Sequence, residues 1–381
     1  MERRTFLIRR FSFRQLGSAL LCALSALGAP AGAQPATTYA DNPAVAQYIT
    51  EIAQKHGFDA AKLTALFAQT NFKPDIIAAI TRPAEAKPWF EYRKIFLTPD
   101  RIKGGAAFMH QNAAALKKAQ QSYGVPPEII TAIIGVETGY GKNQGRYRVM
   151  DALSTLAFDY PQRASFFREE LTQFLLLARE ENVDPLTLGG SYAGAMGQPQ
   201  FMPSSFRQYA VDFDADKRRN LWTDTEDVIG SVGNYFAVHG WLADKPIARK
   251  AQTKNNSVQD LVATGYKPSY TIKDLTARGV TIQGGFKPDL DAALIELALA
   301  DSKSEHWITF TNFYVITRYN HSALYAMAVY QLSDEIKRAA LNKPVKAAAP
   351  STKAKVATTK RKAKTAHKPA AKKPPVKKTP P

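Results

Sequence analysis

The chain has 381 residues, 45% of them apolar, one cysteine (Cys22) and a formal net charge of +18. This length and apolar content support a substantial core in one large domain or two to three smaller ones, and a single cysteine excludes disulfides and cysteine-rich metal sites. The charge does not indicate a body that binds nucleic acid, because residues 1–33 carry a net +4, residues 341–381 carry +13 and the stretch between them carries +1.

Residues 1–33 have the parts of a signal peptide: a basic start with five arginines, an apolar stretch over Leu16–Ala29 and the small-x-small sequence Ala31-Gly32-Ala33. The apolar stretch is too short to span a bilayer comfortably. Cys22 follows two leucines, unlike a lipoprotein acylation site. We therefore expect cleavage near Ala33 and export from the cytoplasm. Arg3-Arg4 resembles a twin-arginine export signal, and the general secretory route is the alternative.

Hydrophobic periodicity in the body is mainly helical. It predicts helices, two of them in the first segment, over Asn42–Ala68, Gly104–Tyr123, Pro127–Thr138, Ala164–Glu181, Asp224–His239 and Ser322–Arg338. Short strands are predicted at Tyr270–Ile272, Ala293–Leu299 and Trp307–Thr311. The expected fold is mainly α, of the α+β class, with a small mixed α/β insertion. Residues 341–381 hold too little apolar surface to offset the entropy of ordering, so we expect a disordered tail.

One acidic residue has an unusual place in a predicted helix. The helix over Pro127–Thr138 carries a stripe of four isoleucines, which Glu137 continues just before two glycines end the helix. A carboxyl group there is partly desolvated and faces the negative end of the helix dipole, and both effects favour its protonated form. A glycosidic general acid requires such a group. The alternative, which periodicity alone favours, is a glutamate that caps the helix or pairs with Lys142 or Arg146.

A stretch rich in small residues extends over Gly189–Ser205. Ser191 nearly fits a nucleophile elbow, but Ala193 stands where the closing glycine belongs. Small residues let a bulky ligand approach the backbone, and the neighbouring amide, methionine and aromatic side chains suit a sugar chain. A tight structural loop is an equal alternative.

Four motifs together resemble those of a known family: Val136-Glu137-Thr138-x-Tyr140-Gly141, Gly194–Ser205, Asn234-Tyr235-Phe236 and Arg318-Tyr319-Asn320. They look like the signature motifs of the membrane-bound lytic murein transglycosylase B family, here in a soluble, non-lipidated member. The resemblance runs from about Asn42 to Arg338. It implies a lysozyme-like fold and non-hydrolytic cleavage of the β-1,4 bond between MurNAc and GlcNAc in peptidoglycan, which leaves 1,6-anhydro-MurNAc ends.

The resemblance also assigns roles to single residues. Glu137 matches the family's catalytic glutamate, which acts first as an acid and then as a base. Ser191 matches a serine near that carboxylate, and Gln200 and Asn320 match amides that contact the glycan. The matching groove aromatics are Tyr92, Tyr235, Tyr319 and Tyr325. Ordinary core packing is the alternative for these rings.

A single essential carboxylate is consistent with this reaction. Ordinary retaining and inverting glycosidases need a second carboxylate, as nucleophile or as base for water. MurNAc supplies its own N-acetyl carbonyl to stabilise C1, and its own O6 hydroxyl as a nucleophile that is already held close. The sequence leaves open a second role for Asp151, Asp159 or Glu180.

An acidic loop resembles a calcium site. Asp212, Asp214 and Asp216 match positions 1, 3 and 5 of a calcium loop, and the family has an EF-hand-like site on which these residues and Asp227 fall. Lys217 replaces the turn glycine and two arginines follow it, so an acidic turn neutralised by cations is an equal alternative. We expect no required cofactor, with calcium as a structural ion if the loop binds it.

These features predict how the chain is organised. The predicted parts are the signal peptide (1–33), an N-terminal helical region (34–115), a lysozyme-like catalytic core with the EF-hand-like loop (116–250), the α/β insertion (251–312), a C-terminal core helix (313–340) and the tail (341–381). The expected partner is the glycan strand of peptidoglycan in the periplasm, with the tail on anionic envelope polymers, no nucleic acid and a monomeric protein. A hydrolytic muramidase on the same fold and a non-catalytic peptidoglycan-binding scaffold are the alternatives.

Overall fold

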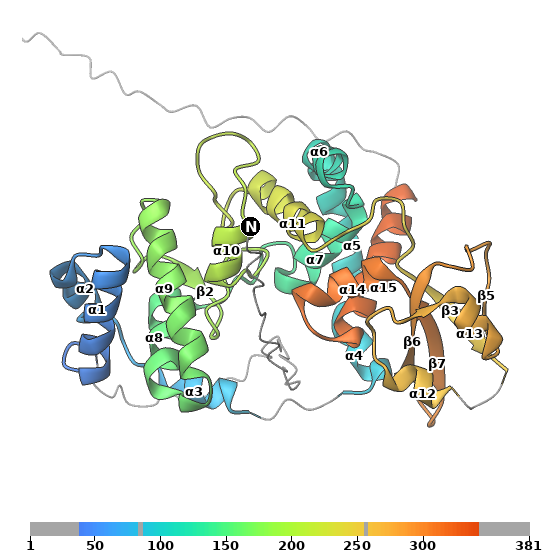
Figure 1. Cartoon of the computed structure of the whole chain (residues 1–381). Helices are drawn as coiled ribbons and strands as arrows, with labels where there is room; N and C mark the ends of the chain where they lie inside the picture. The colour runs from blue at the N-terminus through green and yellow to red at the C-terminus, as the bar shows by residue number, and fades with distance from the viewer. Residues whose placement is uncertain (1–37, 83–86, 255–257, 343–381) are drawn as a thin grey trace, which may run out of the picture. The chain divides into compact units, whose positions relative to one another are not determined.

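The computed structural model describes residues 38–82, 87–254 and 258–342. The predicted signal peptide, and all but the first two residues of the predicted tail, lie outside the described residues. Most of the described part is helical, as expected, and a five-stranded sheet and a two-stranded sheet, β1-β2, accompany the helices (Figure 1). No helix in these ranges is long and apolar enough to cross a membrane.

The helices and strands of Figure 1 have the following bounds. The helices are α1 (Pro43–His56), α2 (Ala60–Phe67), α3 (Pro74–Ile80), α4 (Trp89–Phe96), α5 (Pro99–Gln111), α6 (Ala113–Tyr123), α7 (Pro127–Thr138), α8 (Val149–Asp159), the 3₁₀ turn η1 (Pro161–Arg163), α9 (Ala164–Glu180), α10 (Pro203–Tyr209), α11 (Thr225–Val238), α12 (Gln259–Ala263), α13 (Ile272–Ala277), α14 (Thr311–Tyr319) and α15 (Ala323–Leu341). The strands are β1 (Tyr147–Arg148), β2 (Gly189–Gly190), β3 (Ala248–Thr253), β4 (Tyr270–Thr271), β5 (Val280–Ile282), β6 (Asp291–Ala298) and β7 (Ser304–Thr309).

Local capping explains why most predicted helices are confirmed. The side chain of Asn42 accepts the backbone N–H of Ala44 at 2.9 Å where α1 begins, and Asp224 caps α11 in the same way. A proline begins α7, and Gly139 ends it in the left-handed region with a φ of 59°. These signals lie within a few residues of one another, so the sequence contains them in full.

The single helix predicted over Gly104–Tyr123 is wrong. Thr98 caps an earlier start, and the helix breaks at Asn112, whose side-chain amide donates to the Phe108 carbonyl at 2.9 Å. Two helices, α5 and α6, take its place. Helix α8 escapes prediction for another reason: nearly all of its residues are buried, so no polar face produces a helical period. The short helices α3, α4 and α10 are likewise absent from the predicted set. The single C-terminal core helix predicted over 313–340 is wrong, because two helices, α14 and α15, occupy that range.

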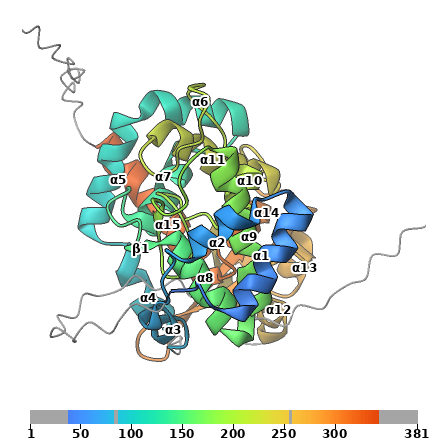
Figure 2. The ribbon, with the colours of Figure 1, turned by 90° about the vertical axis from the view of Figure 1, so that its left-hand side faces the viewer.

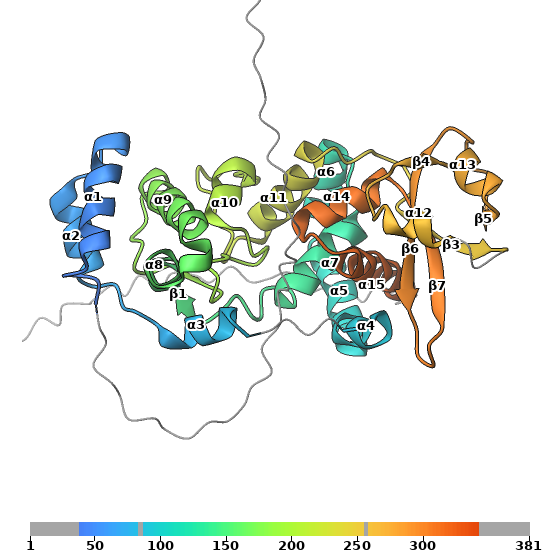
Figure 3. The ribbon, with the colours of Figure 1, turned by 60° about the horizontal axis from the view of Figure 1, so that its bottom comes forward.

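The α/β part contains an antiparallel sheet with strand order β4-β6-β7-β3-β5 (Figure 3). In the β6–β7 hairpin Leu294 lies opposite Ile308, and Ile295 lies opposite Trp307. Because side chains alternate along a strand, Leu294 and Ile308 join a small core with α12 and α13, whereas Ile295 joins the main core. The three predicted strands correspond to β4, β6 and β7, and the polar strand β3 and short β5 were not predicted.

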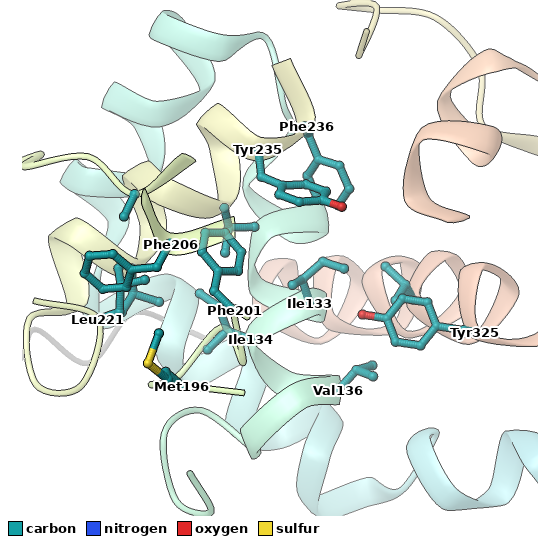
Figure 4. Packing of buried hydrophobic residues seen from close by; sticks show 14 of the residues in the cluster. Ile133, Ile134, Val136, Met196, Phe201, Phe206, Leu221, Tyr235, Phe236 and Tyr325 are labelled. Carbon is teal, nitrogen blue, oxygen red and sulfur yellow. The ribbon is translucent and has the colours of Figure 1, made fainter. Parts of the chain in front are cut away.

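Helix α7 is the centre of the main core. It contacts α5, α6, α11 and α15, and ten of its twelve residues are buried. Figure 4 shows Ile133, Ile134 and Val136 of this helix among aromatic side chains from neighbouring elements. Helix α1, in front with α2 in Figure 2, joins α9 through a 2.8 Å hydrogen bond between Tyr48 and Thr172. The packing of α7 against its four neighbouring helices holds its last turn in place.

Candidate active site

Glu137 lies in that last turn, with only 8% of its surface exposed. Burial raises the pKa of its carboxyl group to about 7, because the charged form loses its hydration. The Tyr325 hydroxyl donates to Oε1 of Glu137 at 2.5 Å and opposes that rise, since it stabilises the carboxylate. The protonated form expected from the sequence is therefore accessible near neutral pH. Desolvation by burial is the cause of the raised pKa.

Tyr140 anchors the end of α7. It adopts a left-handed backbone conformation, with a φ of 65°, and its hydroxyl donates to the Arg101 carbonyl of α5 at 2.6 Å. Its ring fills a slot beside three glycines, Gly104, Gly105 and Gly135, where an added Cβ would approach the ring or its oxygen to 2.6–2.8 Å. The glycines of α5 and α7 thus make room for the side chain that holds these two helices together.

The Gly189–Ser205 loop is attached to the same helix end. The Thr138 hydroxyl donates to the Gln198 carbonyl at 2.9 Å. Ser191 accepts the Ala195 N–H on its side-chain oxygen at 3.0 Å. The Thr138 bond attaches the small-residue loop to the residue that follows Glu137, and the Ser191 bond lies within the loop.

The Gln200 side chain braces the loop. Its amide nitrogen donates to the carbonyls of Gly197 at 2.9 Å and Gln144 at 3.2 Å. Gln144 in turn donates to the Trp222 carbonyl at 3.0 Å. The sequence analysis missed Gln144, Gln198 and Tyr140 as site-forming residues, although Gln198 and Tyr140 lie inside the motifs that it singled out.

The predicted groove aromatics of α11, α14 and α15 pack against one another. Tyr235 donates to the Arg318 carbonyl at 2.7 Å, and Tyr319 donates to the Pro199 carbonyl at 2.6 Å. Tyr319 and Tyr325 are stacked, with ring centroids 6.5 Å apart. Figure 4 shows Tyr325 and Tyr235 from two different helices. These rings make the surroundings of Glu137 apolar, while each hydroxyl has an acceptor.

The other two predicted contact residues are Tyr92 and Asn320. Tyr92 is on α4, with its ring 5.3 Å from that of Phe96. Asn320 is half-buried at the C-terminal end of α14, directly after Tyr319.

The three other candidate carboxylates have partners of their own. Asp151 forms an ion pair with Arg148 at 2.7 Å. Asp159 accepts the Tyr39 hydroxyl at 2.5 Å, and Glu180 pairs with Arg207 at 2.6 Å.

The acidic loop brings three of its four predicted ligands together. Oxygens of Asp212, Asp214 and Asp227 lie within 4.8 Å of one another. Asp216 lies outside this group, and its carboxylate accepts the Arg218 N–H at 2.8 Å. Lys217 has a φ of 74°, the left-handed conformation that the turn glycine of a calcium loop supplies.

The nearby arginine is directed elsewhere. Arg219 pairs with Glu181 and, at 3.7 Å, with Glu180. The alternative in which cations neutralise the acidic loop therefore receives no support from Arg219. Three clustered carboxylates suit a hard cation with oxygen ligands such as Ca²⁺.

A buried carboxyl group with a pKa near neutrality, beside a loop of small residues and a cluster of aromatic rings, is the arrangement that the general acid of a polysaccharide-cleaving enzyme requires. Comparison with known proteins gives the family. The transglycosylase SLT domain matches residues 40–334, and the chain belongs to this family.

The relatives are peptidoglycan enzymes. The chain is 45% identical over 308 residues to membrane-bound lytic murein transglycosylase B of Escherichia coli (strain K12), covering 78% of this chain and 84% of that protein. The soluble lytic transglycosylase SltB1 of Pseudomonas aeruginosa matches with a TM-score of 0.75 and 52% identity, covering 78% of this chain and 99% of that one.

Two further structures contain ligands. Escherichia coli Slt35 in complex with calcium matches with a TM-score of 0.72 and 44% identity over 80% of this chain and 95% of that one. Pseudomonas aeruginosa SltB3 in complex with NAG-anhNAM-pentapeptide matches with a TM-score of 0.69 and 31% identity over 77% and 78%. The predicted family, lysozyme-like fold and activity are confirmed: the chain is a lytic transglycosylase that acts on peptidoglycan.

Proposed function

We propose that Glu137 carries out both proton transfers of the transglycosylase reaction. The observation that supports this most directly is its burial, which raises the pKa of its carboxyl group to about 7 while one hydrogen bond from Tyr325 holds it in place. Near neutral pH such a group is available in both forms. A residue that acts first as an acid and then as a base requires this.

The steps balance without water. The Glu137 carboxyl donates its proton to the glycosidic oxygen as the bond from that oxygen to C1 of MurNAc breaks, and the N-acetyl carbonyl of MurNAc stabilises C1. The O6 hydroxyl then bonds to C1 and gives its proton to the Glu137 carboxylate. The nucleophile is already held within the substrate, a large entropic advantage. The separate partners of Asp151, Asp159 and Glu180 support a mechanism with one carboxylate.

We assign glycan contacts to polar groups that keep hydrogen-bonding capacity. Ser191 accepts one hydrogen bond on its oxygen, which leaves its own proton to donate. The nitrogen of the Gln200 amide is occupied, so its oxygen is the atom we assign to the sugar. Asn320 completes the polar contacts. Tyr92, Tyr235, Tyr319 and Tyr325 are assigned to the groove as aromatic residues.

Mass spectrometry of muropeptides released from purified sacculi tests this proposal. Products with 1,6-anhydro-MurNAc ends, lighter by one water than hydrolytic products, are expected. Reducing MurNAc ends would indicate a hydrolytic muramidase. Binding to sacculi with no released fragment would indicate a scaffold.

We also propose that Asp212, Asp214 and Asp227 hold a structural calcium ion. The cluster within 4.8 Å and the left-handed Lys217 support it, as does the calcium in the Slt35 complex. The ion would stabilise the loop before α11, with no step of the reaction assigned to it. The reaction as written needs no cofactor.

The cellular setting is part of the proposal. We infer export through the signal sequence, cleavage near Ala33 and a monomeric enzyme in the periplasm, where murein is accessible. The basic segment over residues 341–381 would hold anionic envelope polymers.

A further inference from the structure

Arg318 differs from the other arginines of the described residues. Ten of those arginines form ion pairs or donate hydrogen bonds from their side chains. The arginines that do neither are Arg82, Arg93, Arg163, Arg218 and Arg318, and the first four are exposed. Arg318 is half-buried at the end of α14, where its guanidinium lies 5.7 Å from the centre of the Tyr314 ring. A partly buried charge with no counter-ion is unfavourable, so an anion brought by a ligand would be stabilised there.

Neutral groups surround this guanidinium. Tyr266 packs beside Tyr314, with ring centroids 6.4 Å apart. Burial, together with the charge of Arg318, lowers the pKa values of His239 and His321 below their usual range. Both imidazoles are therefore uncharged near neutral pH, and the positive charge at this place belongs to Arg318.

Arg318 lies next to the tyrosine cluster beside Glu137. Its backbone carbonyl accepts the Tyr235 hydroxyl at 2.7 Å. The next residue, Tyr319, is stacked on Tyr325, which donates to Glu137. The guanidinium thus extends from the helix end that also carries Tyr319 and Asn320.

We propose that Arg318 binds a carboxylate on the peptide stem of the peptidoglycan substrate. The inference rests on the proposed function, because it adds a contact to the same substrate. In a strand with intact stems the N-acetylated sugars are uncharged and the lactyl group of MurNAc is an amide, so the carboxylates lie on the stems. A planar guanidinium is matched to a carboxylate by two parallel hydrogen bonds. The Tyr314 ring holds it in place through a cation–π contact.

The test compares two soluble glycan substrates that carry tetrapeptide stems, both with their free amines acetylated. In one the stem carboxylates are left free, and in the other they are converted to methylamides. The measured quantity is the ratio of kcat/KM on the free acid to kcat/KM on the methylamide. We expect about tenfold in the wild type, as one charge-assisted contact contributes, and about one in Arg318→Gln. The ratio for Arg318→Lys should lie between these two values, because lysine keeps the positive charge and cannot form the two parallel hydrogen bonds of a guanidinium.

The ratio is insensitive to general damage, since a poorly folded variant loses activity on both substrates alike. Arg278→Gln is the matched control: Arg278 pairs with Asp260 at 2.9 Å in the α/β part, and its loss should leave the wild-type ratio. A wild-type ratio near one, or the same ratio in Arg318→Gln as in the wild type, would overturn the proposal. Formation of anhydro ends from either substrate is scored separately, so failure of the proposed function is distinguishable from failure of the carboxylate site.

Discussion

Replacing Tyr325 by Phe should shift the pH dependence of the enzyme toward higher pH. Within the described residues, the Tyr325 hydroxyl is the hydrogen-bond donor to Glu137, at 2.5 Å. A hydrogen bond to a charged group contributes about 1.5–3 kcal/mol, and one pH unit corresponds to about 1.4 kcal/mol. Without this donor the carboxylate is less stable, so the pKa of Glu137 should rise from about 7 by roughly one to two pH units.

Because the first step uses protonated Glu137, kcat/KM falls as pH rises through this pKa. The alkaline limb of the Tyr325→Phe profile should therefore shift to higher pH than that of the wild type, by the same interval of roughly one to two pH units. The assay is chromatographic release of anhydro products from soluble glycan fragments between pH 5 and pH 10. Tyr330→Phe is the control on the same helix, because Tyr330 donates to the Ala248 carbonyl and does not contact Glu137. An alkaline limb that stays in place or moves to lower pH in Tyr325→Phe would refute the reasoning.

Three further predictions concern Glu137, the acidic loop and the basic C-terminal segment. Glu137→Gln should lower turnover by about 10²-fold or more. The folded pKa of Glu137 exceeds its ordinary value of 4.5, so its contribution to stability is present below about pH 4.5 and lost as pH rises through about 7, by up to about 3 kcal/mol. Glu137→Gln should therefore melt above the wild type at pH 8 but not at pH 4. Calcium should raise the melting temperature of the wild type and not that of Asp214→Asn, and an equal rise in both would exclude the site. Deleting residues 341–381 should leave turnover of soluble fragments intact and remove the salt-sensitive part of sacculus binding in pull-downs across a salt series, whereas identical curves would exclude a wall anchor.

The sequence predicts the parts of the site that depend on neighbouring residues. The bounds of α7 follow from a proline start and a glycine end, and the apolar stripe places Glu137 on the buried side. The acidic loop is similarly local, although only three of its four aspartates converge. What the residues alone do not predict is the partner of Glu137, because Tyr325 lies 188 positions away. The family resemblance supplied Tyr325 as a groove aromatic, and the structure adds that its hydroxyl donates to the carboxyl group.

The Tyr140 slot shows a second limit of sequence reasoning. The sequence gives no sign that Gly104, Gly105 and Gly135 belong to one site. Only the packing of α5 against α7 shows that all three leave space for one ring. Helix α8 is hidden for the opposite reason, since uniform burial removes the polar face from which a helix is recognised.

The tyrosine cluster explains how one chain can keep a glutamate protonatable near neutral pH. Rings from α11, α14 and α15 displace water from Glu137, and that burial raises its pKa. The same burial would be unfavourable for the phenol groups if they lacked acceptors, and two of them use the backbone carbonyls of Arg318 and Pro199. The third, Tyr325, is directed at Glu137 and limits the rise. A cluster built of phenylalanines would desolvate the carboxyl group without that limit, so the pKa of Glu137 would lie further above neutrality and the group would be a weaker general acid.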